Sequence, residues 1–274
     1  MTTALDPGLA AALRDHGHAI RPVLEAPLVA RLAARFATLG PGTEAPVYRT
    51  FTDDPRHQAR SVDLELKAQL RSPVAALLPG HEIVLATFVN KAAHGPSIDW
   101  HQDWTFTDER EHRSVLLWIP LVDVDEDRGG LGVIPGSHLW TSGIRTSSLT
   151  REGPTVPHQE AMEAAAEFAP LPAGTAVVYD PATIHGSKPN RADRARPALI
   201  VITAPAGAPV LHFCEEESTV GYVVDEAFFT TREFESVPVG YPTIEPWAPP
   251  VTSEDFVAPL AALAAARRPP VQRS

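Results

Sequence analysis

Residues 175–203 read TAVVYDPATIHGSKPNRADRARPALIVIT, and this stretch decides the fold. It begins and ends with apolar runs rich in β-branched residues, which are typical of β-strands. The polar segment Lys188–Arg194 between them predicts a turn, which would lay residues 184–187 antiparallel to a strand that begins near Arg196. On neighbouring strands, His185 and Arg196 would then share one pocket.

The same texture recurs on both sides of this stretch. Short β-rich runs alternate with clusters of Gly, Pro, Asp and Asn, which is the pattern of a sandwich or barrel. The runs are Ile83–Val89, Val115–Ile119, Leu131–Ile134, Thr175–Tyr179, Ala198–Thr203, Val210–Cys214 and Val220–Val224. The 28 prolines, about twice the usual share of ~5%, also favour loop-rich β structure. We therefore expect a mainly β fold with flanking helices.

Helical patterns lie toward both ends of the chain. Before residue 80, apolar residues recur at three- and four-residue spacing in three stretches, of which the second would stop at Gly40–Gly42 and the third would bend near Pro73. We expect one domain over residues 1–274. Its parts are a mainly helical region (1–80), a β core (83–224) with an insertion (145–170) that carries the helical stretch EAMEAAAEF, and a proline-rich tail (238–274) with a helix at Ser253–Arg267.

Composition excludes several classes of protein. The 34 acidic and 23 basic side chains give a net charge of −11, which disfavours binding to nucleic acid or to an anionic membrane surface. Cys214 is the only cysteine, so no internal disulfide and no multi-cysteine metal site can form. The amino-terminal sequence lacks the pattern of a secretory signal, and no run approaches the ~18 apolar residues of a membrane span. We expect a cytoplasmic protein with a small-molecule partner.

The densest chemical signal is DWHQDW at residues 99–104. In an extended segment, residues two apart face the same way, so the imidazole of His101 and the carboxylate of Asp103 would project together. His185 would complete a two-histidine, one-carboxylate set of the kind that holds Fe(II) and leaves positions open. Arg196 in the same pocket would need an anion, and its guanidinium fits a carboxylate. This combination indicates an iron enzyme with an acidic co-substrate.

Structural explanations compete for single residues. His101 and Asp103 alone could form an exposed ion pair, and His185 alone could be a hydrogen-bonded core histidine. We interpret His138 as part of a turn after Pro135-Gly136. His94, His112 and His212 fit the pocket rim, but solvated loop or β positions explain each of them as well. We assign Cys214 to a buried apolar site, and Glu215–Glu217 and Asp123–Asp127 to solvated loops.

Three motifs in order resemble one known family. HQDW (101–104), WIPLVDVDEDRGGLGVIPGSH (118–138) and HGSKPNRADRAR (185–196) are similar to the phytanoyl-CoA dioxygenase family of Fe(II)/2-oxoglutarate oxygenases. The resemblance covers about residues 83–204. It implies a double-stranded β-helix, a jelly-roll or cupin-like core.

The resemblance also implies roles for single residues. Iron would be held by His101, Asp103 and His185. 2-Oxoglutarate would be bound by Arg196 and Ser187 at its distal carboxylate, with Trp118 and Thr87 as further co-substrate residues. Trp104 and Phe106 come shortly after His101 and Asp103, and we expect them either to form an apolar wall of the substrate pocket or to pack in the core.

The implied activity consumes 2-oxoglutarate and O₂, releases succinate and CO₂, and hydroxylates a small molecule, which we place in specialised metabolism. The intact carboxylate of Asp103 disfavours halogenation, which in related enzymes uses a small residue at that position. Desaturation, epimerisation or oxidative cyclisation at the same iron site is the alternative. A third possibility is a non-catalytic β-sandwich binding module. No motif in the sequence identifies the substrate or the oligomeric state.

Overall fold

A six-stranded antiparallel sheet forms the centre of the protein. In the computed structural model, residues 5–39, 45–53, 58–148, 152–215, 217–231 and 236–266 are described. The strand order is β1 (His18–Pro22), β9 (Thr175–Tyr179), β5 (Val115–Pro120), β11 (Arg196–Pro205), β3 (His81–Lys91) and β2 (Val47–Arg49). The short β-rich runs predicted β9, β5, β11 and β3, which are largely buried, whereas β1 and β2 lie in the region 1–80 that was expected to be mainly helical.

Two smaller sheets complete the β structure. One has the order β4 (Ile98–His101), β10 (His185–Ser187), β6 (Gly132–Val133) and β8 (Glu167–Phe168). The other has the order β14 (Thr243–Ile244), β13 (Thr219–Val224), β12 (Val210–Glu215) and β7 (Ser147–Ser148). The expected mainly β fold with flanking helices is therefore confirmed.

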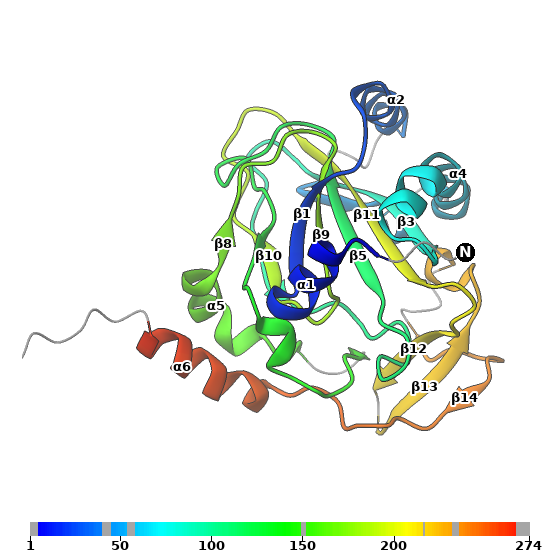
Figure 1. Cartoon of the computed structure of the whole chain (residues 1–274), viewed down its shortest axis with the longest axis vertical. Coiled ribbons are helices and arrows are strands. Elements are labelled where there is room, and N and C mark those ends of the chain that lie inside the picture. Colours follow the sequence, from blue (N-terminus) through cyan, green and yellow to red (C-terminus); the bar gives the residue numbers. More distant parts are fainter. Residues whose placement is uncertain are drawn as a thin grey trace, which may run out of the picture.

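Helices flank the sheets. They are α1 (Pro7–His16), α2 (Ala26–Ala37), α3 (Thr50–Asp53), α4 (Ala59–Leu77), α5 (Gln159–Ala165) and α6 (Val257–Ala266), with single 3₁₀ turns at 137–139, 156–158, 228–230 and 253–256. In Figure 1, α2 and α4 lie on the outer side of β3 and β11, whereas α5 and α6 lie beside the sheet that contains β8 and β10. None of the described helices combines the length and apolar character needed to cross a membrane.

Elementary sequence signals explain the ends of the helices. The side chain of Asp6 accepts a hydrogen bond from the backbone N–H of Leu9 and caps α1, and Gly17 ends that helix at φ 77°. Pro73 lies inside α4, which continues to Leu77. The predicted stop at Gly40–Gly42 lies outside the described residues, as does Arg267 at the end of the predicted terminal helix.

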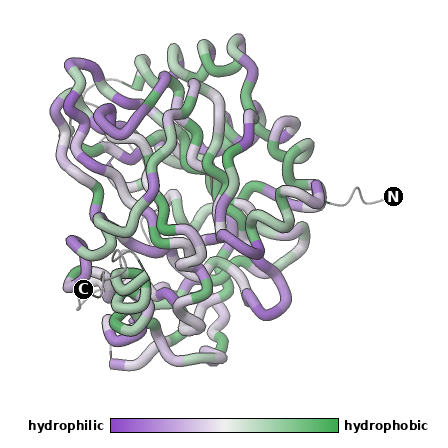
Figure 2. The backbone as a smooth tube through the Cα atoms, turned by 60° about the vertical axis from the view of Figure 1, so that its left-hand side comes forward, coloured by the Kyte–Doolittle hydropathy of each residue, from purple (hydrophilic) through white to green (hydrophobic). Residues whose placement is uncertain are grey.

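The two faces of the central sheet pack against different parts of the protein. On β5, Leu117 and Ile119 pack with the helices in one apolar cluster, whereas Leu116 and Trp118 belong to a second cluster on the other face. β11 alternates in the same way, because successive side chains of a strand point to opposite faces. Figure 2 shows hydrophobic colour along the interior segments and hydrophilic colour mainly along the loops. The second face is therefore the one that looks toward the polar residues of the site.

The chain crosses between sheets where a hairpin was predicted. β10 pairs with β4 and β6, whereas β11 pairs with β3 and β5 in the central sheet. The prediction that residues 184–187 pair with the strand that begins near Arg196 is therefore wrong. His185 and Arg196 still line one pocket, because the two sheets face each other across it.

Candidate active site

Three potential metal ligands meet at the edge of the β4–β10 pair. His101 ends β4, His185 begins β10, and the two residues are direct partners in the antiparallel register. Asp103 follows β4, and one donor atom from each of the three residues lies within 4.8 Å of the others. Asp103 stands in a loop beyond the end of the strand, so the alternation expected of an extended segment does not by itself place it. The donor set of two imidazoles and one carboxylate suits Fe(II).

Backbone carbonyls orient both imidazole rings. Nδ1 of His101 lies 2.7 Å from the carbonyl oxygen of Asp99, and Nδ1 of His185 lies 2.9 Å from that of Thr183. A carbonyl only accepts, so each Nδ1 carries the proton and each Nε2 presents its lone pair. Nε2 of His185 is 3.5 Å from Oδ2 of Asp103. Histidines that bind a metal ion through one ring nitrogen usually donate a hydrogen bond from the other nitrogen to a carbonyl or carboxylate, as these two Nδ1 atoms do.

The electrostatic setting keeps the His101 imidazole neutral. Burial lowers the pKa of His101 to about 4, and the neighbouring His185 and the positive charge of Arg49 act in the same direction. A neutral imidazole is ready to bind a metal ion without first releasing a proton.

A tyrosine that the sequence analysis did not single out supports the carboxylate. The hydroxyl of Tyr179, at the end of β9, donates a hydrogen bond of 3.1 Å to Oδ2 of Asp103. Burial, followed by the charge of Asp103, raises the pKa of Tyr179 well above its ordinary value. The hydroxyl therefore stays protonated and remains a donor.

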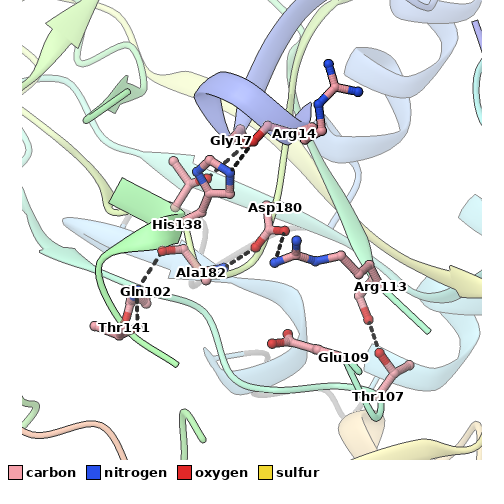
Figure 3. A network of polar contacts seen from close by, with 12 residues as sticks. Arg14, Gly17, Gln102, Thr107, Glu109, Arg113, His138, Thr141, Asp180 and Ala182 are labelled. Carbon is pink, nitrogen blue, oxygen red and sulfur yellow. Dashed lines mark hydrogen bonds and ion pairs between the residues drawn. The ribbon is translucent and has the colours of Figure 1, made fainter. Parts of the chain in front are cut away.

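The loop that carries Asp103 is tied to the turn before β10. The backbone N–H of Asp103 donates to the carbonyl of Pro181 over 2.9 Å, and the side-chain amide of Gln102 donates to that of Ala182 over 2.6 Å. Figure 3 shows this contact together with Asp180, which accepts from the N–H of Ala182 and pairs with Arg113 at 3.0 Å. The network fixes one ligand segment relative to the other.

The insertion adds a further brace. Nε of Arg145 donates to the carbonyl of Asp103 over 2.7 Å, and the same guanidinium pairs with Glu109. The Arg145 side chain is 6% exposed, and the carboxylate of Glu109 compensates its buried charge.

Beside the three ligands lies a pocket that we call the arginine pocket, lined among others by Trp118, Ser187 and Arg196. Arg196 is 2% exposed, and the described residues offer its guanidinium no ion pair or hydrogen bond, with Nε among the buried atoms that lack a partner. Its guanidinium carbon lies 5.0 Å from the centre of the Trp118 ring. Burial lowers the pKa of Arg196 to about 10. A buried, unpaired cation of this kind fits a carboxylate ligand.

A second buried cation stands next to it. Lys91 ends β3 directly opposite Arg196 in the register and is fully buried. Its ammonium group donates to Oγ of Ser187 over 2.7 Å and to the carbonyl of Lys188. Burial, reinforced by the charge of Arg196, lowers the pKa of Lys91 to about 7. Because Ser187 accepts from Lys91, its own hydroxyl proton is available to a ligand. Lys91 was missed, because only the pairing of β3 with β11 reveals it.

The predicted substrate residues line a different cavity, which we call the aromatic cavity. Trp104, Phe106 and Phe229 form its aromatic side, and His101 and Asp103 line both this cavity and the arginine pocket. Trp104 and Phe229 stack with ring centres 6.4 Å apart. Thr87, expected beside the co-substrate, lines the aromatic cavity, whereas Asn90 from the same strand lines the arginine pocket.

The other candidate residues have structural positions. His138 is buried in a 3₁₀ turn, with Nε2 3.0 Å from the carbonyl of Arg14, as the turn interpretation expects. His94 is exposed and pairs with Asp193. His212 takes a β position, in β12 (Val210–Glu215), where it is 1% exposed rather than solvated and lies 5.4 Å from the Trp104 ring. Cys214 is buried, as predicted.

Two histidines and one carboxylate at the edge of facing antiparallel sheets, beside a buried arginine, define the class of jelly-roll proteins with a facial metal site. The sequence model of the phytanoyl-CoA dioxygenase (PhyH) family matches residues 4–198. This is more than half of the chain, so the protein belongs to the phytanoyl-CoA dioxygenase family, as its motifs predicted.

Similar proteins carry related descriptions. The probable alpha-ketoglutarate-dependent hypophosphite dioxygenase of Stutzerimonas stutzeri is 29% identical over 129 residues, which are 45% of this chain and 45% of that protein. Over this region the chain therefore spans less than half the length of that curated relative.

Solved structures show the same fold. The non-heme alpha-ketoglutarate-dependent epimerase SnoN from nogalamycin biosynthesis is 20% identical with a TM-score of 0.55, over 90% of this chain and 96% of that chain. EvdO2 from Micromonospora carbonacea var. aurantiaca, solved in complex with 2-oxoglutarate, is 24% identical with a TM-score of 0.52, over 75% and 93%. The expected jelly-roll core is thereby confirmed.

Proposed function

We propose that this protein is an Fe(II)/2-oxoglutarate-dependent oxygenase that hydroxylates a small molecule in specialised metabolism. The observation that carries the proposal is that two features meet at one place: a cluster of two histidines and one carboxylate, and a pocket whose buried Arg196 has no anionic partner among the described residues. Membership of the family supports it. The cytoplasmic location, the single domain and the lack of nucleic-acid or membrane partners stay predictions from the sequence.

In this proposal the residues divide the work. Fe(II) would be held by Nε2 of His101, Nε2 of His185 and a carboxylate oxygen of Asp103. Arg196 and the hydroxyl of Ser187 would bind the distal carboxylate of 2-oxoglutarate, and Trp118 would cover one side of the pocket. Together with O₂, the bound iron and 2-oxoglutarate supply the oxidising power, and the co-substrate leaves as succinate and CO₂.

The aromatic cavity would hold the substrate against the same ligands. Its apolar side limits water, and Thr87 is one of the polar side chains that line it. Desaturation, epimerisation or oxidative cyclisation would use the same residues and differ in where the substrate is held. Product mass separates three groups of outcomes: hydroxylation adds one oxygen, desaturation and oxidative cyclisation each remove two hydrogens, and epimerisation leaves the mass unchanged.

Anaerobic spectroscopy tests the proposal. Adding Fe(II) and 2-oxoglutarate to the purified protein should produce a weak visible charge-transfer band that neither component gives alone. Admission of air should then convert 2-oxoglutarate to succinate, slowly without substrate and faster with one. If the band is absent and no succinate forms with any candidate substrate, the protein is a binding module that kept the fold.

We expect Tyr179→Phe to weaken Fe(II) binding by about tenfold, within the 10–100-fold range for loss of a group that supports a metal ligand. The change removes the hydrogen bond to Oδ2 of Asp103 and keeps the ring. Titration with Fe(II) in the presence of 2-oxoglutarate measures it. Tyr48→Phe is the matched control, because Tyr48 belongs to the helix-side cluster on the other face of the sheet. Equal affinity in both variants would remove Tyr179 from the support of the ligand.

We expect the affinity for 2-oxoglutarate to fall severalfold between pH 7 and 9, an interval set by the Lys91 pKa of about 7. Above this pKa the free protein has lost the ammonium charge beside Ser187, and binding of a dianion must restore it at a cost that grows with pH. Without ligand, stability should rise with pH above about 7, since the unfolded chain still holds the proton that the folded chain has lost. In Lys91→Met, calorimetry at several pH values should show a 2-oxoglutarate affinity and a stability without this dependence on pH. A slope unchanged in this variant would assign the titration to another group.

A further inference from the structure

The aromatic cavity contains a cation that the proposed iron site does not use. Arg49 ends β2 and lines both the aromatic cavity and the arginine pocket. Its backbone N–H donates to the carboxylate of Asp53. Its guanidinium makes no ion pair or hydrogen bond with any of the residues that the structure describes.

The acidic character of the chain makes this unpaired cation informative. The net charge of −11 means that carboxylates outnumber basic groups. Several other arginines accordingly pair with a carboxylate. In the aromatic cavity the acidic lining residue is Asp103, whose carboxylate is proposed for the metal ion. Arg49 therefore offers its charge to a ligand that enters the cavity.

The rest of the lining defines the shape of that ligand. Trp104, Phe106 and Phe229 give the cavity an extended apolar side. Such surfaces favour an apolar or aromatic body over a small, fully hydrated ion. Arg49 lies where the aromatic cavity joins the arginine pocket. The charged end of a bound molecule would therefore be directed toward the three residues proposed to hold the metal ion.

Two further polar groups of the lining lack partners. The side-chain amide of Gln102 donates to Thr141 and Ala182, as Figure 3 shows, and this fixes its orientation. Its Oε1 and the Oγ1 of Thr52 are buried and have no hydrogen-bond partner among the described residues. Buried polar atoms without partners are uncommon in native proteins and indicate a missing ligand or water.

We propose that the aromatic cavity binds a small organic acid, with its acidic group on Arg49 and its apolar body against Trp104, Phe106 and Phe229. The inference rests on the proposed function, since it names the class of substrate for the same site. It makes Arg49 a substrate-binding residue that is distinct from the co-substrate residue Arg196.

Matched pairs of ligands test the charge requirement. The panel consists of arylacetic, arylpropionic and medium-chain fatty acids, each paired with its primary amide, and it includes acetate as an acid without an apolar body. Binding to the protein loaded with Fe(II) and 2-oxoglutarate is measured by calorimetry without oxygen. We expect at least one acid to bind about tenfold or more tightly than its amide, and acetate to bind far more weakly. If no acid exceeds its amide, the proposal is wrong.

Two variants separate the two parts of the lining. Arg49→Gln should remove the preference for the acid and leave affinity for the amide nearly unchanged. Phe229→Ala should weaken acid and amide alike and keep the preference. A preference that survives in Arg49→Gln would overturn the assignment of the acidic group to Arg49.

The same variants distinguish this proposal from the function on which it rests. Arg49→Gln should lose much less affinity for 2-oxoglutarate than Arg196→Gln does, although Arg49 also borders the arginine pocket. A loss as large as that of Arg196→Gln would place Arg49 in the co-substrate site and overturn the proposal. Failure of the proposed function would instead appear in the unmodified protein, as an absent charge-transfer band before any organic acid is added.

Discussion

Replacing His101 with alanine is expected to abolish Fe(II)-dependent succinate formation. The change removes one of three groups whose donor atoms lie within 4.8 Å of one another, leaving one imidazole and one carboxylate. Loss of a ligand should cost more than the roughly 10–100-fold in affinity that loss of a supporting hydrogen bond costs. Iron content after anaerobic loading and the visible band with 2-oxoglutarate measure the effect.

The fold should survive this change. Burial lowers the pKa of His101 to about 4, so the side chain is uncharged at neutral pH and its removal strands no ionic partner. His16→Ala is the matched control, because His16 is an exposed histidine at the end of α1. A normal band in His101→Ala would contradict the ligand assignment, whereas loss of the band together with the circular dichroism signal would indicate unfolding.

The sequence motifs named the three candidate ligands, although the strand alternation expected for Asp103 does not place it, because Asp103 lies in a loop beyond β4. The spacing of His101 and Asp103 and the short apolar runs around them are properties of a few neighbouring residues, and the structure brings these side chains together with His185. The stated reason for the position of Arg196 was wrong. A turn after Ser187 suggested a hairpin, but in a sandwich the chain can cross to the facing sheet. The apolar pattern of one strand does not show which other strand it pairs with.

The residues that were missed depend on long-range pairing. Lys91 meets Ser187 because β3 pairs with β11 across more than one hundred residues of sequence. Arg49 reaches both cavities because β2 is the edge strand beside β3. Tyr179 supports Asp103 from the end of β9. Their only signal in the sequence is a polar or charged group at the end of an apolar strand, which many surface positions share.

Replacing Arg196 with glutamine is expected to raise the concentration of 2-oxoglutarate needed for half-maximal succinate formation by about thirtyfold or more. Removing one partner of a buried hydrogen-bonded charge pair costs about 2–5 kcal/mol, and each 1.4 kcal/mol is a factor of ten. Iron content should stay normal, since no ligand is changed. Arg191→Gln is the control, because that arginine is exposed and pairs with Asp127 at the surface.

Thermal unfolding distinguishes a binding role for Arg196 from a structural one. In the free protein the guanidinium is buried, has no anionic partner among the described residues and pays a desolvation cost that lowers its pKa to about 10. Arg196→Gln removes that charge, so without 2-oxoglutarate the variant should unfold at the same or a higher temperature than the unmodified protein. Added 2-oxoglutarate should then raise the unfolding temperature of the unmodified protein much more than that of the variant, because a ligand stabilises the folded state only to the extent that it binds it. A variant that is less stable without ligand, and is stabilised by 2-oxoglutarate as strongly as the unmodified protein, would show that Arg196 holds the fold together and that another group binds the co-substrate.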